Sequence, residues 1–157
     1  MGGTDKPVEI LLVEDNPADI QLITQLFKQT KLNPRITTVT DGEKATAHLF
    51  QKVKEGVAPR PELIILDLNL PCKDGRQVLE EVKTNPETRT IPVLIFTTSP
   101  SSDDVSRCYT LHANSYISKP SDLTRFNDVL KSIEDFWFNI VALPESNSEM
   151  GIARVRE

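Results

Sequence analysis

Short runs of hydrophobic residues alternate along the chain with longer segments in which hydrophobic residues recur every three or four positions. The runs have the length of β-strands, and the periodic segments have the length of helices. Continuous hydrophobic strands are typical of a parallel sheet that helices cover on both faces, so the pattern predicts an α/β fold with a doubly wound sheet. The predicted strands lie at about 8–13, 35–39, 62–67, 91–96 and 114–118, and the predicted helices at about 17–30, 42–54, 74–84, 102–111 and 122–140.

The composition is typical of one globular domain. The 157 residues suffice for one full hydrophobic core but not for two domains of ordinary size. No hydrophobic stretch approaches the about 20 residues of a membrane span, and the N-terminus has no secretory signal, so we expect a cytoplasmic protein. An N-terminal extension at 1–7 and a flexible tail at 144–157 are expected to flank a domain at 8–143.

Charge and cysteine content argue against two further classes. The net charge is −5 and Lys and Arg form no dense block, which disfavours direct binding to nucleic acid. Cys72 and Cys108 lie far apart, and only His48 and His112 are available beside them as zinc ligands. We therefore expect two reduced thiols and no zinc site.

Acidic residues stand at the ends of two predicted strands. Asp67 ends one hydrophobic run, and Glu14 and Asp15 end another. The carboxyl ends of parallel strands meet at one edge of the sheet, where open α/β folds place their sites. Three acids there would repel one another, so a bound cation explains them better than helix capping, and Mg²⁺ is the expected ion because it prefers oxygen ligands. General acid–base work by a carboxylate pair is the alternative.

Two more strand ends carry polar residues. Thr97 ends the fourth predicted strand, and Lys119 follows the fifth. Each residue alone is ordinary, because threonine is common in strands and lysine on surfaces. A carboxylate, a metal ion, a hydroxyl and an ammonium together form a site for a phosphoryl group, with the carboxylate as a possible nucleophile.

Five separated motifs carry these residues. They are Val-Glu-Asp-Asn-Pro at 13–17, Asp-Leu-Asn-Leu-Pro at 67–71, Asp-Gly at 74–75, Thr-Thr-Ser at 97–99 and Lys-Pro at 119–120. In order and spacing they resemble the receiver domain of two-component response regulators, over about residues 8–140. The resemblance implies a flavodoxin-like (βα)5 fold with strand order 2-1-3-4-5.

The resemblance also implies roles for the site residues. Asp67 would accept a phosphoryl group from the phosphohistidine of a sensor histidine kinase and would bind Mg²⁺. The other metal ligands would be Glu14, Asp15 and the backbone carbonyl of Asn69. Lys119 would pair with the acyl phosphate.

A conformational switch is implied as well. Thr97 would turn toward the phosphoryl group after transfer, and Tyr116 would then swing inward. The Lys119–Pro120 peptide bond would be cis. Thr98 departs from the family pattern, which has a smaller residue there, and is expected to narrow access and slow dephosphorylation.

Three further segments point to closer relatives. These are His112–Pro120, the insertion Lys54–Arg60, and Ser132–Trp137. They are similar to the small single-domain regulators that serve cyanobacterial phytochrome kinases, and they imply a phytochrome-type kinase as the partner.

The output is expected to be a surface, because an attached output domain is not expected. Six hydrophobic residues of the last predicted helix follow a 3–4 spacing that predicts the core face: Leu123, Phe126, Leu130, Ile133, Trp137 and Ile140. Three others lie off this stripe: Val129, Phe136 and Phe138. They predict a protein interface, most simply of a homodimer, along the fourth helix with Tyr109, the fifth strand with Tyr116, and the fifth helix. An unknown downstream protein would read this surface.

Other function classes stay open on the same fold. The expected protein is not an enzyme beyond its own phosphotransfer and dephosphorylation. A haloacid-dehalogenase-type phosphatase needs a second acid where this chain has Asn69, and a flavodoxin needs a Ser/Thr/Gly-rich phosphate loop where it has Glu14–Pro17. An adaptor that is never phosphorylated would leave the acidic pocket unused.

Overall fold

The protein folds into a parallel sheet between two layers of helices. The computed structural model describes residues 7–30, 33–144 and 153–154. The sheet has 5 strands in the order β2-β1-β3-β4-β5, which confirms the predicted α/β fold and strand order. The strands are β1 (Glu9–Val13), β2 (Arg35–Val39), β3 (Leu63–Leu66), β4 (Val93–Thr97) and β5 (Ser115–Ser118). The α-helices are α1 (Pro17–Lys28), α2 (Gly42–Ala47), α3 (Gly75–Thr84), α4 (Ser102–Thr110) and α5 (Leu123–Glu134).

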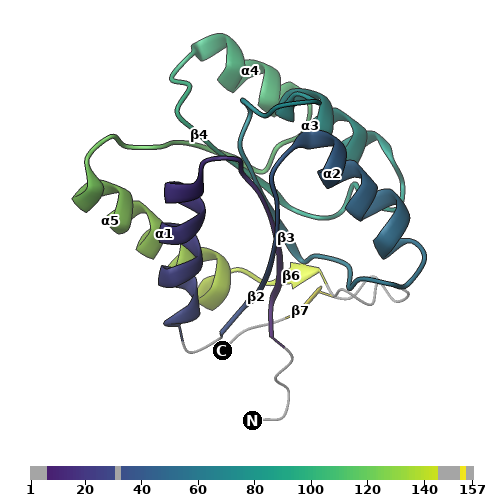
Figure 1. Cartoon of the computed structure of the whole chain (residues 1–157), viewed down its shortest axis with the longest axis horizontal. Helices are drawn as coiled ribbons and strands as arrows, with labels where there is room; N and C mark the ends of the chain where they lie inside the picture. Colours follow the sequence, from purple (N-terminus) through teal and green to yellow (C-terminus); the bar gives the residue numbers. More distant parts are fainter. Residues whose placement is uncertain (1–6, 31–32, 145–152, 155–157) are drawn as a thin grey trace.

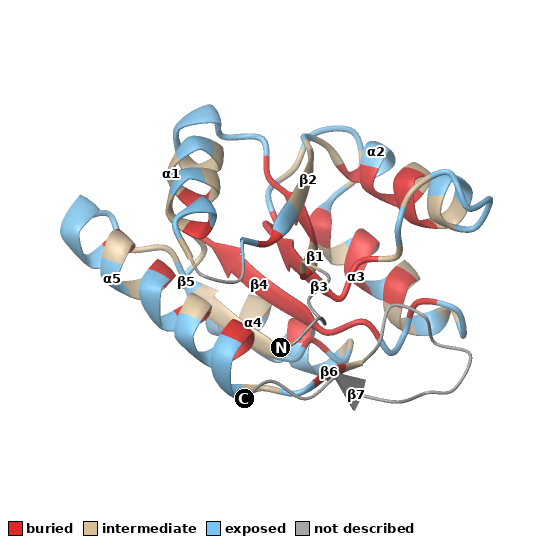
Figure 2. Ribbon diagram, turned by 90° about the horizontal axis from the view of Figure 1, so that it is seen from below, coloured by how far each residue is buried: buried red, intermediate tan, exposed pale blue. Residues whose placement is uncertain are grey.

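The helices cover the two faces of the sheet unequally. α1 and α5 lie on one face, and α2, α3 and α4 lie on the other (Figure 1). Successive residues of a strand point to opposite faces, so Ile10 and Leu12 of β1 enter the core cluster under α1 and α5. Leu11 and Val13 enter the second cluster, under α2, α3 and α4. The central strands are therefore buried on both sides (Figure 2).

Two helices end in π-helical turns that the sequence did not predict. α2 continues into η2 (His48–Val53), and α5 continues into η3 (Asp135–Ile140). A π-turn closes hydrogen bonds over five residues instead of four, so the side chains that follow shift around the helix axis. The predicted core stripe is therefore confirmed from Phe126 to Trp137, which are buried, and is wrong for the last residues of η3.

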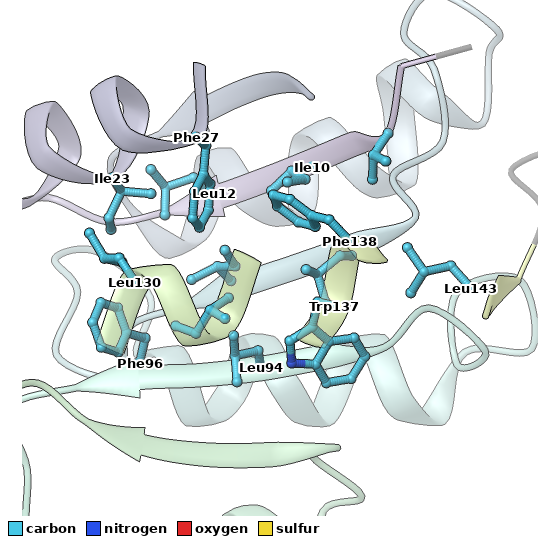
Figure 3. Close-up of a cluster of buried hydrophobic side chains, with 14 of the residues drawn as sticks. Ile10, Leu12, Ile23, Phe27, Leu94, Phe96, Leu130, Trp137, Phe138 and Leu143 are labelled. Atoms are coloured by element: carbon cyan, nitrogen blue, oxygen red, sulfur yellow. The ribbon is translucent and has the colours of Figure 1, made fainter. Parts of the chain in front are cut away.

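The shifted register changes which aromatic residues reach the core. Phe138, predicted off the core stripe, is fully buried, and its ring centroid lies 5.1 Å from that of Phe27 (Figure 3). Ile140, predicted in the core, is 63% exposed. At the first residue of α5, Leu123 is also exposed, because the helix begins beyond the edge of the core cluster.

The predicted interface residues differ in how far they are exposed. Phe136 is 51% exposed and Tyr109 47% exposed, so both are accessible to a partner. Val129 is half-buried and packs against the core cluster of α1 and α5, which corrects its placement on a purely external face. The reason is helical spacing: Val129 lies three residues after Phe126 and four before Ile133, both buried, so it borders their side of α5.

The predicted terminal segments fall largely outside the described residues. Of the extension at 1–7 only residue 7 is described, and of the tail at 144–157 only residues 144 and 153–154. There β6 (Leu143–Pro144) pairs antiparallel with β7 (Ala153–Arg154). Within the described ranges, no helix is both long and apolar enough to cross a membrane. The domain limits themselves stay a prediction.

Candidate functional site

Hydrogen bonds of the sheet position the acidic residues. The N–H of Asp67 donates to the carbonyl of Val13, and the N–H of Glu14 donates to the carbonyl of Val39. The parallel ladder thus extends one residue beyond β1 and β3 and aligns both acids at the same edge. The pairing of Val13 with Leu66 in the ladder sets this alignment.

The neighbouring strands deliver the threonine and the lysine. Thr97 is the last residue of β4 and pairs with Ser118 of β5. The N–H of Lys119 donates to the carbonyl of Thr97 at 2.7 Å, which fixes the backbone from which the lysine side chain extends. The structure therefore brings together the polar residues predicted at the four strand ends.

Close backbone packing holds the loop that follows Asp67. The N–H of Gly75 donates to the carbonyl of Leu68 at 2.9 Å. A Cβ at Gly75 would overlap the carbonyl oxygen of Asp67, and a Cβ at Gly42 would overlap that of Lys73. Only residues without a side chain allow α2 and α3 to begin this close to the acidic edge.

Lys119 is the centre of the site. Its side chain is only 3% exposed, and its Nζ lies 2.6 Å from Glu14 Oε1, 2.8 Å from Asp19 Oδ2 and 3.2 Å from Asp67 Oδ2. A buried ammonium is favourable only where such partners compensate for its lost hydration. One cation therefore balances part of the charge of three neighbouring carboxylates.

Asp19 is a residue of this site that the sequence analysis missed. It lies in the first turn of α1, where Asn16 caps the helix by accepting hydrogen bonds from the N–H groups of Ala18 and Asp19. An acid in this position is usually explained by the favourable charge at a helix N-terminus. The signal that could have found it is Pro17, which fixes the start of α1 and so places Asp19 one turn beyond the acids of β1.

The acidic cluster fits a divalent cation. One carboxylate oxygen from each of Glu14, Asp15 and Asp67 lies within 4.8 Å of the other two. An octahedral Mg²⁺ site with bonds of about 2.1 Å places opposite ligands about 4 Å apart, so small side-chain movements would close this set around an ion. Glu14 and Asp67 are buried, whereas Asp15 is exposed and leaves room for water ligands. Asn69 is exposed, and its carbonyl remains a predicted ligand.

Burial and charge act on the two central groups in opposite senses. Burial raises the pKa of Glu14 to about 7, although the hydrogen bond from Lys119 lowers it. Burial also disfavours the charged form of Lys119, but its hydrogen bonds to Asp19 and Glu14 outweigh this effect and raise the pKa of the ammonium. Lys119 therefore stays protonated.

The residues predicted to form a switch lie on the neighbouring strands β4 and β5. Thr97 is fully buried, and its Oγ1 accepts a long hydrogen bond of 3.5 Å from the N–H of Ser99. The hydroxyl of Tyr116 donates to the carbonyl of Ser99 at 2.9 Å, and the ring packs against the core cluster of α2, α3 and α4. The Lys119–Pro120 bond is trans, so the expected cis bond is wrong. The trans form is intrinsically preferred for a peptide bond before proline, and the path of the chain after β5 does not require the cis form.

A buried carboxylate beside an ammonium and a cation site is suited to receive a phosphoryl group, and fold and site together define a receiver. Residues 10–131 match the family model of the response regulator receiver domain, so the chain belongs to that family.

Individual relatives are similar over nearly the whole chain. The response regulator Rcp1 of Synechocystis sp. is 43% identical over 141 residues, which cover 90% of this chain and 96% of Rcp1. The crystal structure of the Mn²⁺-bound form of Rcp1 matches with a TM-score of 0.85 and 44% identity, over 88% of this chain and 100% of that chain. The phosphorylated cyanobacterial phytochrome response regulator RcpA also matches with a TM-score of 0.85 and 44% identity, over 89% of this chain and 100% of that chain.

Proposed function

We propose that this protein accepts a phosphoryl group from a histidine kinase onto Asp67, in a reaction that depends on Mg²⁺, and signals through a protein-interaction surface. The observation that carries the proposal is the contact of Lys119 Nζ with Asp67 Oδ2 at 3.2 Å, within a cluster of three potential metal ligands. Capping of helices alone would not place a buried ammonium among these carboxylates.

The residues divide the chemistry between them. A carboxylate oxygen of Asp67 attacks the phosphorus of the donor, a P–O bond forms, and the P–N bond to the donor histidine breaks with its electron pair leaving on nitrogen. Mg²⁺ held by Glu14, Asp15 and Asp67 would neutralise charge on the phosphoryl oxygens. Lys119 exchanges part of its contact with the acids for the phosphoryl oxygens, where it stabilises the acyl phosphate.

The buried hydroxyl of Thr97 is the proposed sensor of that group. It lies at the end of β4, beside the strand that carries Asp67. A turn of Thr97 toward the phosphoryl oxygens would move the residues that follow it. One of these is Ser99, whose carbonyl accepts a hydrogen bond from the hydroxyl of Tyr116. Thr97 and Tyr116 are therefore the proposed switch residues.

A phytochrome-type histidine kinase is the proposed donor. Support comes from the similarity to RcpA, which is described as a cyanobacterial phytochrome response regulator, and to Rcp1. Cys72 and Cys108 are free thiols, as is typical of a reducing compartment, so the proposed place of action is the cytoplasm.

The proposed output surface lies along α4, β5 and the last helix. Tyr109 and Phe136 are large, exposed and apolar there, and Ile140 extends the exposed apolar set on η3. Burial of such side chains against a second copy of the chain would make a homodimer. A downstream protein would bind the same surface or the dimer.

Incubation with acetyl phosphate followed by intact mass measurement tests the proposal. The protein should gain the mass of one phosphoryl group in the presence of Mg²⁺ and none in the presence of excess EDTA. A wild-type protein that gains no mass although it binds Mg²⁺ would favour the adaptor that is never phosphorylated. A gain that EDTA does not suppress would contradict the metal dependence.

A further inference from the structure

A half-buried ion pair joins the helix after Asp67 to the helix after Thr97. Arg76 is the second residue of α3, and Asp104 lies in the first turn of α4. Arg76 Nε donates to Asp104 Oδ1 at 2.8 Å, and Arg76 Nη2 donates to Asp104 Oδ2 at 2.7 Å. Arg76 Nη1 also donates to Asp74, which caps the start of α3. The guanidinium thus fixes α4 relative to the loop that leaves the acidic edge.

The Arg76–Asp104 ion pair has the geometry of a strong, bidentate ion pair. The two side chains are only 15% and 18% exposed, and the pair has two parallel hydrogen bonds. Such bidentate pairs hold their geometry better than pairs in which lysine supplies a single point charge. The hydrogen bond from Arg76, with a second from Ser99, lowers the pKa of Asp104 to about 2, so the carboxylate stays ionised at neutral pH.

Ser99 continues the link toward the switch residues. Its hydroxyl donates to Asp104 Oδ2 at 2.6 Å, and its carbonyl accepts the hydroxyl of Tyr116 at 2.9 Å. Its N–H is the group that donates to Thr97 Oγ1. Ser99 therefore forms hydrogen bonds with Thr97, Asp104 and Tyr116, each through a different polar group.

We propose that Arg76 is a positioning residue which, through Asp104 and Ser99, restrains the loop between β4 and α4 and so opposes the movement of Thr97 and Tyr116. This inference rests on the proposed function, because that movement is the response to phosphorylation of Asp67. Ser99 cannot follow Thr97 toward the acidic edge without stretching its bond to Asp104, which Arg76 holds in place. The strength of this link then sets how readily the switch responds.

Fluorine NMR of protein labelled with 3-fluorotyrosine offers a direct test. The chain contains only 2 tyrosines, and Tyr109 is exposed whereas Tyr116 is half-buried, so two separate resonances are expected. Replacement of Tyr116 by Phe assigns them. Beryllofluoride with Mg²⁺ serves as the phosphoryl probe, and its titration gives the midpoint of the Tyr116 response.

Arg76→Ala and Ser99→Ala should both shift the Tyr116 resonance before any probe is added. Both should also lower the beryllofluoride midpoint, by at least about fivefold for Arg76→Ala, as expected for loss of a typical coupling between sites. Arg76→Lys should fall between wild type and Arg76→Ala, because lysine keeps the charge but not the paired hydrogen bonds. Arg107→Ala is the matched control, since it removes an exposed arginine of α4 near Asp104 and should change neither quantity.

The outcomes separate this inference from the proposed function. An unchanged Tyr116 resonance in a folded Arg76→Ala protein, or an equal shift in Arg107→Ala, would overturn the positioning role. So would a beryllofluoride midpoint that stays the same or rises. If wild-type protein binds no beryllofluoride and accepts no phosphoryl group, the proposed function fails, and the Tyr116 resonance without probe alone decides whether Arg76 positions the loop. Thermal melts identify any variant that is not folded.

Discussion

The acidic edge of the sheet and the exposed side of the last helix differ in how their residues are held. At the edge, Lys119 contacts three carboxylates, and the backbone of each strand end is fixed by the ladder. On the last helix, Phe136 and Ile140 are exposed side chains on a helix whose register changes at η3. A change at the edge should therefore alter chemistry, whereas a change on the helix should alter either stability or assembly, depending on which way the residue faces.

The largest expected effect comes from a comparison of one core-facing and one exposed residue of the last helix. Phe126→Asp should destabilise the monomer by about 4 kcal/mol or more, because the new carboxylate would enter the core beside Phe96, where it has no partner. Phe136→Asp should leave a folded protein that no longer self-associates. Thermal melts and light scattering distinguish these results, and a folded Phe136→Asp protein that is still dimeric would defeat the proposed interface.

Lys119→Ala should have the next largest effect. Transfer from acetyl phosphate should slow by about a hundredfold, as is typical when a group that stabilises charge in the transition state is removed. Mg²⁺ binding should persist, because the three carboxylates are all still present. Rates of mass gain and calorimetry measure the two quantities, with Lys131→Ala on the exposed side of α5 as the control. A wild-type rate of transfer in the Lys119→Ala protein would show that Lys119 takes no part in phosphotransfer.

Asp15→Asn should weaken Mg²⁺ binding by about tenfold or more, since the ion would lose one of its few anionic ligands. Phosphorylation at limiting Mg²⁺ should fall with it. Asp103→Asn, an exposed acid in the first turn of α4, should leave the affinity unchanged. Equal affinities of wild type and Asp15→Asn in calorimetry would exclude Asp15 as a ligand.

The smallest predicted effect concerns the pH dependence of stability. Asp104 has its pKa lowered from 3.8 to about 2, first by the hydrogen bond from Arg76. Its contribution to stability is therefore complete above its unfolded pKa near 4 and is lost as the pH falls toward 2. Asp104→Asn should flatten the loss of stability between pH 4 and pH 2 in denaturant titrations. The same slope in wild type and variant would show that the carboxylate is not stabilised in the folded protein.

The contrast between edge and helix also explains what the sequence could predict. A hydrophobic run that ends in a polar residue locates a strand end, and parallel strand ends must meet, so the gathering of Asp67, Thr97 and Lys119 followed from pattern alone. The environment of Asp19 could not be predicted in this way, because its contact with Lys119 joins two residues 100 positions apart, one on α1 and the other directly after β5. The π-turns escaped prediction because hydrophobic spacing assumes a constant helical repeat, and this error misplaced Phe138 and Ile140.

The proposed function depends on Asp67 as the residue that carries the phosphoryl group. Borohydride reduces an acyl phosphate to an alcohol, so treatment of the phosphorylated protein followed by peptide mass spectrometry locates the modified carboxyl group. Wild-type protein should show the reduced residue at position 67 only. Asp67→Asn should gain neither the phosphoryl mass nor the reduced residue, whereas Asp128→Asn on α5 should behave as wild type. A reduced residue at another carboxyl group, or phosphoryl gain in the Asp67→Asn protein, would contradict the account.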